Sequence, residues 1–163
     1  MNLVEIKKEI PDAILDIRYA TTNNFTGKII YEKPFALLEP DALDTLKKAA
    51  DEFRAQGLRI VVFDAWRPPE AQDRLREVCS DDKYVAETPR HASGRVIDMS
   101  LADLAGAYLD MGTDYDDFSN KAHADFVLED PAQQQNRLTL GRVMANNGFK
   151  QYKYEWWDFE LQV

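Results

Sequence analysis

Apolar residues are spaced in two different ways across residues 39–63, and the two spacings predict a helix followed by a strand. In residues 39–57 the apolar positions recur every three or four residues, as on one face of an amphipathic helix. These positions are Leu43, Leu46, Ala50 and Phe53. The segment Glu39-Pro40-Asp41 begins this helix, and Gly57 is well placed to end it. The next six residues, 58–63, are LRIVVF, a β-branched run typical of a buried strand.

Three further segments carry clear signals. The prolines at positions 68 and 69 predict the first turn of a helix that covers residues 70–79. Residues 96–101 predict a second buried strand. The dipeptide Asp130-Pro131 predicts an N-cap and first turn, so we expect a helix from there to Asn147, ended by Gly148.

The remaining parts of the chain are less regular. Residues 152–163 are rich in aromatic side chains and predict a terminal strand, whereas residues 102–129 are acidic and show no periodicity. Because helices and strands do not alternate as repeated βαβ units, we expect an α+β fold with a mostly antiparallel central sheet flanked by helices. A chain of 163 residues is expected to form a single domain, residues 1–163.

The charge balance narrows the choice of partners. The formal net charge is −9, which argues against nucleic acid or an anionic membrane as the main partner, since both demand a basic surface. The only cysteine is Cys79, which fits a reducing compartment, and no segment resembles a signal peptide or membrane span. We therefore expect a cytoplasmic protein without membrane insertion, and its oligomeric state is not predicted.

Two short segments carry the candidate chemistry. His91 and Asp98 supply an imidazole and a carboxylate with Gly94 between them, and the pair Trp156-Trp157 is framed by Glu155 and Asp158. A catalytic zinc ion usually takes three protein ligands and keeps a fourth position for water. One of the two later carboxylates can complete the ligand set while the other acts as a general base. In a regular strand Glu155 and Asp158 face opposite sides, so both reach one site only if the strand bends or ends between them.

Five segments, in order, resemble the family of D-alanyl-D-alanine dipeptidases, which belongs with D,D-carboxypeptidases and the hedgehog signalling domain to a wider group of zinc peptidases. The resemblance covers nearly the whole chain. The matching segments are Asp16 to Gly27, Phe63 to Pro68, His91 to Asp98, Met111 to Asp116, and Glu155-Trp-Trp.

The resemblance implies a hedgehog/D,D-peptidase-like fold and a role for each matched residue. His91 and Asp98 would be ligands of one Zn²⁺ ion, and Asp158 stands where the family has a third ligand, a histidine. Glu155 would be the general base and acid. Arg67 would stabilise the oxyanion, since its charge is permanent and its donors are planar. For substrate binding, Asp64 would orient Arg67 and Asp116 would pair with the ammonium group of a free dipeptide.

Three positions depart from the family pattern. Asp158 in place of histidine makes a His-Asp-Asp ligand set, for which we expect weaker zinc binding, slower hydrolysis and a shift towards ions such as Mn²⁺. Pro89 replaces a serine and can remove a substrate contact, and Val96 replaces an alanine. The connection from Cys79 to Tyr84 is short, which can open the cleft to longer peptides.

The sequence therefore predicts a metal-dependent hydrolase that cleaves D-Ala-D-Ala or a related short cell-wall peptide. Two alternatives stay open: a metal-impaired, non-catalytic binding protein on the same fold, and a carboxypeptidase or endopeptidase that acts on longer peptidoglycan stems. His123, the only other histidine, is expected at the surface.

Overall fold

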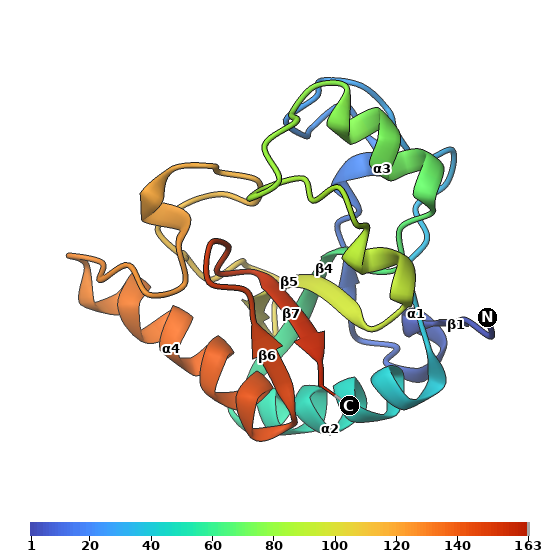
Figure 1. Cartoon of the computed structure of the whole chain (residues 1–163). Helices are drawn as coiled ribbons and strands as arrows, with labels where there is room; N and C mark the ends of the chain where they lie inside the picture. The colour runs from blue at the N-terminus through green and yellow to red at the C-terminus, as the bar shows by residue number, and fades with distance from the viewer. Residues whose placement is uncertain (163) are drawn as a thin grey trace.

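A five-stranded sheet with two long helices on one face forms the centre of the protein (Figure 1). The computed structural model describes residues 1–162. The helices are α1 (Ile6–Glu9), α2 (Pro40–Ala55), α3 (Pro69–Arg76) and α4 (Pro131–Asn146). The strands are β1 (Val4–Glu5), β2 (Ile14–Leu15), β3 (Leu37–Leu38), β4 (Leu58–Asp64), β5 (Val96–Asp103), β6 (Phe149–Gln151) and β7 (Asp158–Leu161). Short 3₁₀ turns cover Arg18–Ala20, Arg90–Ser93 and Asn120–Ala122.

The sheet topology confirms the expected fold class, α+β with a mostly antiparallel sheet. The strand order is β2-β4-β5-β7-β6, and among these neighbours only β2 and β4 run parallel. A separate two-stranded sheet pairs β1 with β3, and the sequence pattern did not predict it. Within residues 1–162, no helix is long and apolar enough to cross a membrane.

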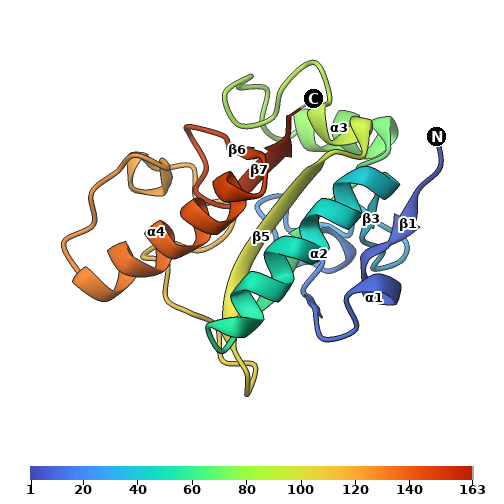
Figure 2. The same cartoon turned by 90° about the horizontal axis from the view of Figure 1, so that it is seen from below.

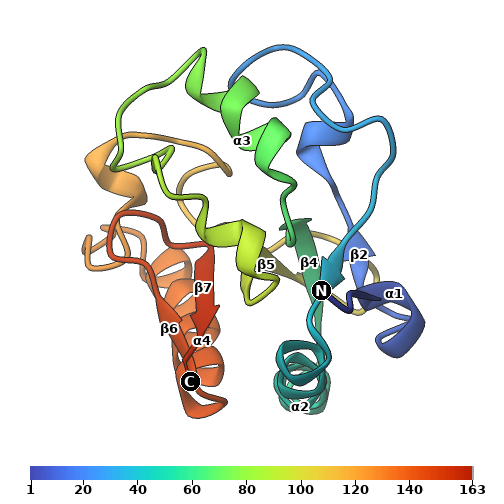
Figure 3. The same cartoon turned by 45° about the vertical axis from the view of Figure 1, so that its right-hand side comes forward.

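The two faces of the sheet have different cover. Helices α2 and α4 lie side by side under one face, and α3 lies on the other side of the sheet (Figures 2 and 3). On β5, Ile97 and Met99 are fully buried in the apolar core, and Asp98 between them projects from the opposite face because strand side chains alternate. The face that carries Asp98 is therefore free to form a polar site beneath the segments around α3.

The predicted strand over residues 152–163 is wrong in its first half. Residues 152–157 connect β6 to β7, and a turn is held by hydrogen bonds from the Glu155 N–H to Tyr152 O (3.3 Å) and from the Asp158 N–H to Glu155 O (3.4 Å). Here the buried indoles of Trp156 and Trp157 pack edge to face, with ring centroids 5.3 Å apart, so adjacent side chains do not alternate between two faces as they would in a strand. The chain thus bends between Glu155 and Asp158, which is the condition that lets both carboxylates reach one site.

The other predicted elements are confirmed, with small shifts at their ends. The helix predicted to run to residue 79 ends at Arg76, and the two buried strands extend to Asp64 and Asp103. Gly57 and Gly148 follow α2 and α4 with φ angles of +76° and +85°, as expected for glycines that end helices. The irregular stretch predicted for residues 102–129 contains one 3₁₀ turn and no long element.

Gly94 holds the 3₁₀ turn that carries His91. Its φ angle is +74°, its N–H donates to the His91 carbonyl over 3.2 Å, and its own carbonyl accepts from the Glu39 N–H over 2.9 Å. A Cβ atom at this position would lie 2.9 Å from Leu3 Cδ2 and 3.0 Å from Glu39 Cγ. The position therefore requires glycine for its backbone conformation and for the close packing around it.

We predict that Gly94→Ala destabilises the protein by at least about 1 kcal/mol more than Gly27→Ala. Gly27 also has a positive φ angle, +66°, but a Cβ there meets nothing within 4 Å. Both changes carry the left-handed backbone cost of about 1–2 kcal/mol, and only Gly94→Ala adds overpacking, which costs about 1–3 kcal/mol. Urea unfolding of both variants measures the difference, and equal losses of stability would contradict it.

Candidate active site

Three buried aspartates form a row across adjacent strands of the sheet. Asp98 on β5 pairs in register with Asp64 on β4 and with Asp158 on β7. All three are 0–3% exposed. Residues directly opposite each other on neighbouring strands project to the same side, where like charges repel. A row of three carboxylates in the protein interior requires cations beside it.

The outer aspartates of the row each bind an arginine. Asp64 Oδ2 accepts hydrogen bonds from Arg67 Nε (2.9 Å) and Nη2 (2.7 Å). The two oxygens of Asp158 accept from Arg90 Nη1 and Nη2, both at 2.9 Å, in a fork-to-fork pair. Both outer carboxylates are therefore charge-paired through direct, two-point contacts.

The middle aspartate, Asp98, faces an imidazole instead. Its Oδ2 accepts from the Tyr115 hydroxyl (2.8 Å), and its Oδ1 lies 3.4 Å from His91 Nε2. Within residues 1–162, Asp98 Oδ1 is a buried oxygen without a hydrogen-bond partner. An orphaned carboxylate oxygen is costly in the interior, so this atom is a candidate for binding a cation.

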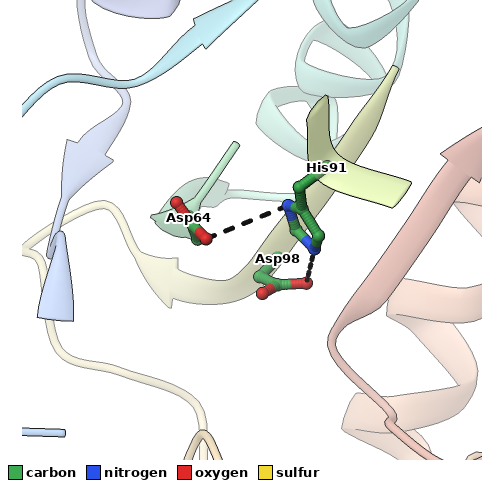
Figure 4. A group of neighbouring side chains, drawn as sticks. All are labelled: Asp64, His91 and Asp98. Carbon is green, nitrogen blue, oxygen red and sulfur yellow. Dashed lines mark ion pairs between the residues drawn. The ribbon is translucent and has the colours of Figure 1, made fainter. Parts of the chain in front are cut away.

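The imidazole of His91 is oriented so that Nε2 is the free nitrogen. Its Nδ1 lies 2.7 Å from the Ala65 carbonyl oxygen, which can only accept, so Nδ1 carries the donated proton. Nε2 then points towards Asp98 Oδ1 and towards Asp158 Oδ2, which lies 3.8 Å away. Figure 4 shows the ring between two carboxylates, with Asp64 near Nδ1 and Asp98 near Nε2.

The distances around His91 Nε2 suit a divalent ion. Ligand atoms about 2.0–2.1 Å from a tetrahedral zinc ion lie roughly 3.3 Å from one another, close to the 3.4 Å and 3.8 Å that separate His91 Nε2 from Asp98 Oδ1 and Asp158 Oδ2. A hydrogen bond from the second ring nitrogen to a carbonyl is the usual support for a ligating histidine. Within residues 1–162, the ligand atoms that all lie within 4.8 Å of one another belong to Asp64, His91 and Asp98, and Asp158, the third ligand expected from the sequence, lies on the other side of Asp98.

Asp64 also lies close to His91 and Asp98, as Figure 4 shows, but its oxygens are already committed. Oδ1 accepts from the Tyr31 hydroxyl (2.8 Å) and the Ala65 N–H (3.0 Å), and Oδ2 accepts twice from Arg67. Its side chain is fully buried. Asp64 therefore has no free surface for a substrate, and its contacts suit the orientation of Arg67 that we expected of it.

A small cleft of about 40 Å³ opens onto this cluster. Arg67, His91, Asp98, Asp116, Glu155 and Asp158 all line it, so six of the seven predicted site residues meet at one surface. Arg67 also donates to Gln72 Oε1 (2.7 Å) and lies over the Tyr19 ring at 5.2 Å. His123, expected at the surface, is half-buried against Tyr154 and does not line the cleft.

Residues 82–86 form part of the cleft wall, although we expected the short connection near them to leave the cleft more open. The Tyr84 hydroxyl donates to the Phe118 carbonyl (2.6 Å), and the Tyr152 hydroxyl donates to the Lys83 carbonyl (2.9 Å). The Tyr84 and Phe118 rings stack at 4.6 Å. This segment, which we call the roof, is therefore tied to both sides of the cleft.

The acidic groups of the cleft hold protons more tightly than usual. Burial raises the pKa of Glu155 well above its ordinary value, and the neighbouring Asp158 and Asp98 raise it further. Burial likewise raises the pKa of Asp116 to about 7 and raises that of Asp98. Burial is the largest single effect on His91 and disfavours its charged form, but the Asp98 and Asp158 carboxylates together outweigh it and raise the pKa of the imidazole to about 10. These shifts follow from burial and from the closeness of several carboxyl groups.

Asp158 differs from its acidic neighbours. Burial favours its neutral form, but contacts with His91 and Arg90 outweigh burial and lower the pKa of this carboxyl below its ordinary value. It therefore stays ionised as a potential ligand.

Asp116 lies in a strained turn at the edge of the cleft. It has a φ angle of +58°, and its carboxylate accepts from the Tyr19 hydroxyl over 2.8 Å. Such backbone strain in a residue other than glycine is frequent at functional sites. Its position on the cleft wall allows the contact with a substrate ammonium that we predicted.

Two residues of the site were not identified from the sequence. Arg90 binds Asp158, and Tyr115 binds Asp98. Arg90 directly precedes His91, so a cation beside a ligand candidate was a visible signal, but its carboxylate partner lies 68 residues away. Tyr115 is adjacent to Asp116, and its sequence context gave no comparable signal.

Comparison with known proteins places the chain in a family. A family model described as D-ala-D-ala dipeptidase matches residues 1–162. A D-alanyl-D-alanine dipeptidase of Escherichia coli (strain K12) is 38% identical over 162 residues, covering 98% of this chain and 84% of that protein. A D-alanyl-D-alanine dipeptidase of Enterococcus faecalis (strain ATCC 700802 / V583) is 28% identical over 170 residues, covering 90% of this chain and 84% of that protein.

One solved structure is more distant. It is titled as the vancomycin-resistance D,D-dipeptidase VanXYg in complex with a D-Ala-D-Ala phosphinate analog. It is 19% identical, with a TM-score of 0.49, and the alignment covers 98% of this chain and 66% of that one. The similarity is too low to assign any property to this chain.

The fold brings one histidine and several carboxylates together in a buried cluster at a sheet face, beside a cleft. The chain belongs to the D-Ala-D-Ala dipeptidase family of peptidases, as the match over residues 1–162 and the 38% identical relative show. The resemblance inferred from the sequence motifs is therefore confirmed.

We predict that metal binding releases at least one proton and strengthens as the pH rises. The pKa of His91 is about 10 without an ion, so near pH 7 the imidazole is protonated and must lose that proton to ligate. Competition by protons falls as pH approaches 10, so affinity rises about tenfold per pH unit below it. Zinc calorimetry in buffers of different ionisation enthalpy counts the protons, and a count of zero would contradict the ligand role of His91.

Proposed function

We propose that the protein is a metal-dependent dipeptidase that hydrolyses D-Ala-D-Ala or a related short cell-wall peptide. The observation that carries the proposal is the convergence of His91 Nε2, Asp98 Oδ1 and Asp158 Oδ2, with the Glu155 carboxyl group in the same cleft. The names of the relatives from Escherichia coli and Enterococcus faecalis support this choice of substrate. A cytoplasmic location is part of the proposal and rests on the cysteine content.

The ion we propose is Zn²⁺, one per chain, with Mn²⁺ as the alternative that two carboxylate ligands favour. Such an ion supplies a polarised water molecule and Lewis acidity at the scissile carbonyl. Asp98 and Asp158 provide oxygens, and His91 provides Nε2. The Tyr115 hydroxyl holds Asp98 in place, and the Ala65 carbonyl holds His91, through the hydrogen bonds described above.

Glu155 is the general base and acid of the proposed reaction. Its carboxyl group is 6% exposed, lines the cleft, and has a raised pKa that suits a group able to take up and return a proton. It takes a proton from the attacking water and delivers it to the amine of the leaving D-alanine. It lies in the turn over residues 152–157, on the wall of the cleft that the proposed ligands also line.

Arg67 and Asp116 contact the substrate in this proposal. Arg67 stays fully charged, since Asp64 offsets the burial of the guanidinium, and its donors can stabilise the oxyanion. Asp64 acts on the substrate only by positioning Arg67. Asp116 pairs with the ammonium group of the dipeptide. The roof over residues 82–86 limits the length of peptide that fits, which favours a dipeptide over longer stems.

The direct test is release of free D-alanine from D-Ala-D-Ala by the purified protein with zinc, manganese or cobalt supplied. We expect release that a chelator stops and re-added metal restores, while L-Ala-L-Ala under the same conditions serves as the stereochemical control. If no D-alanine is released above background with any of the three ions, the proposed function is wrong.

We predict that Glu155→Gln lowers kcat about 10²–10⁴-fold and keeps the bound metal. The amide preserves shape but cannot move the proton, and general acid–base catalysis contributes a factor of that size. Glu129→Gln is the matched control, because Glu129 is exposed and lies outside the cleft. Steady-state kinetics and elemental analysis of both variants check the prediction, which fails if Glu155→Gln retains more than a tenth of the activity.

A non-catalytic binding protein on the same fold is the second candidate. The observation that favours it is the pairing of both Asp158 oxygens with Arg90, which competes with metal ligation. Elemental analysis separates the candidates: stoichiometric metal supports the hydrolase, and its absence after purification with added zinc supports the binding protein.

A further inference from the structure

We propose that Arg90 and Asp158 work as one unit that replaces a neutral third metal ligand. Asp158 supplies the oxygen, and Arg90 positions that oxygen and cancels its charge. The inference rests on the metal site of the proposed function and adds a positioning residue to it.

Arg90 is held rigidly for this task. Its guanidinium donates to both oxygens of Asp158 at 2.9 Å, and to Glu160 Oε2 from Nη2 (3.2 Å) and Nε (3.4 Å). The same group lies over the Tyr152 ring at 4.6 Å. Two carboxylates and an aromatic face therefore fix the plane of the guanidinium, which in turn fixes the plane of the Asp158 carboxylate.

Arg90 has little capacity left for a substrate. A guanidinium offers five N–H donors, and four of its hydrogen bonds go to Asp158 and Glu160. Although Arg90 lines the cleft, its donors point to Asp158 and Glu160 on β7. Arg67 differs from Arg90 in this respect, because its Nη2 lies 3.8 Å from Asp98 Oδ2.

Asp158 Oδ2 can accept a hydrogen bond from Arg90 and bind the proposed ion at the same time. Asp158 Oδ2 is 2.9 Å from Arg90 Nη1 and 3.8 Å from His91 Nε2. A carboxylate oxygen has two lone pairs, so accepting from Arg90 leaves one directed elsewhere. Hydrogen bonds to ligating carboxylates are a normal feature of metal sites.

The charge arithmetic explains why the arginine is needed. With Asp98 and Asp158 both ionised, the ligands alone would neutralise a divalent ion and weaken its effect on bound water. The guanidinium cancels the charge of Asp158, so the ion, its ligands and Arg90 together keep one positive charge; Glu160, which also pairs with Arg90, is 38% exposed, and solvent screens its charge. A site with one carboxylate and two neutral imidazoles has the same net charge.

This pairing makes the effects of residues 90 and 158 interdependent. In Asp158→His, a neutral ligand replaces the buried carboxylate that pairs with Arg90. The guanidinium then keeps only the partly exposed Glu160 as its partner, so its remaining positive charge lies beside the ion and repels it. Removing Arg90 as well relieves that repulsion. Arg90 should therefore help metal binding when residue 158 is aspartate and hinder it when residue 158 is histidine.

The test is a double-mutant cycle on the full chain, with zinc affinity measured by competition with a chromogenic chelator. The four proteins are the wild type, Arg90→Gln, Asp158→His and the double variant. We expect Arg90→Gln to weaken zinc binding about tenfold in the wild type, as loss of a partner of a ligand does. In the Asp158→His background the same change should strengthen binding at least tenfold. A change in the same direction in both backgrounds overturns the proposal.

Matched variants guard against a merely structural effect. Arg95→Gln removes a neighbouring arginine that pairs with Asp41 outside the cleft, so it should leave zinc affinity within twofold of wild type. Arg90→Lys keeps the charge without the fork and should fall between wild type and Arg90→Gln. If Asp158→His fails to fold, as judged by its melting temperature without metal, Asp158→Asn provides the second neutral background with the same expectation.

The outcomes also separate this inference from the proposed function. Opposite effects of Arg90→Gln in the two backgrounds, in a wild-type protein that cleaves no dipeptide, would support the unit and reject the dipeptidase. Dipeptide cleavage with effects of the same sign would reject the unit and support the dipeptidase.

Discussion

The register of β4, β5 and β7 is the constraint on which the site depends. It aligns Asp64, Asp98 and Asp158 in one buried row, and a shift of one residue would turn a carboxylate into the apolar core. The sheet tolerates this row because each outer carboxylate has its own arginine, while the middle one shares the histidine. These partners offset the cost of burying three like charges, and they hold the carboxylates and their donors in fixed orientations.

The residues with different proposed roles lie on different kinds of structural element. Strands and the short turn before β5 carry the residues proposed to hold the ion, whereas Glu155 lies on the connection between β6 and β7. The proposed ligands thus lie on the most rigid elements, where small errors in position matter most. Glu155, the proposed proton-transferring group, lies on a turn that contains two buried indoles packed against each other. The excess of carboxylates leaves the cleft with protons that a cation can displace.

Much of this could be read from the sequence, and the failures have physical causes. Helices α2 and α4 and strands β4 and β5 follow from periodicity and end signals, because those signals are local. Six of the seven expected site residues line one cleft, and five short motifs in a recognisable order were the signal that singled them out. The turn over residues 152–157 was missed because adjacent aromatics resemble a strand in composition, and only tertiary packing bends them. Arg90 was missed because its partner is joined to it by sheet pairing, which no local pattern encodes.

The position of Trp157 has a consequence for observing the site. Its indole is 1% exposed, lines the cleft, and directly precedes Asp158, while Trp66 and Trp156 do not line the cleft. Indole emission responds to nearby charge and polarity, so the chain carries an intrinsic fluorophore at the proposed cation site. Binding of an ion there would be followed optically in the unlabelled protein, on the timescale of mixing and without any substrate present.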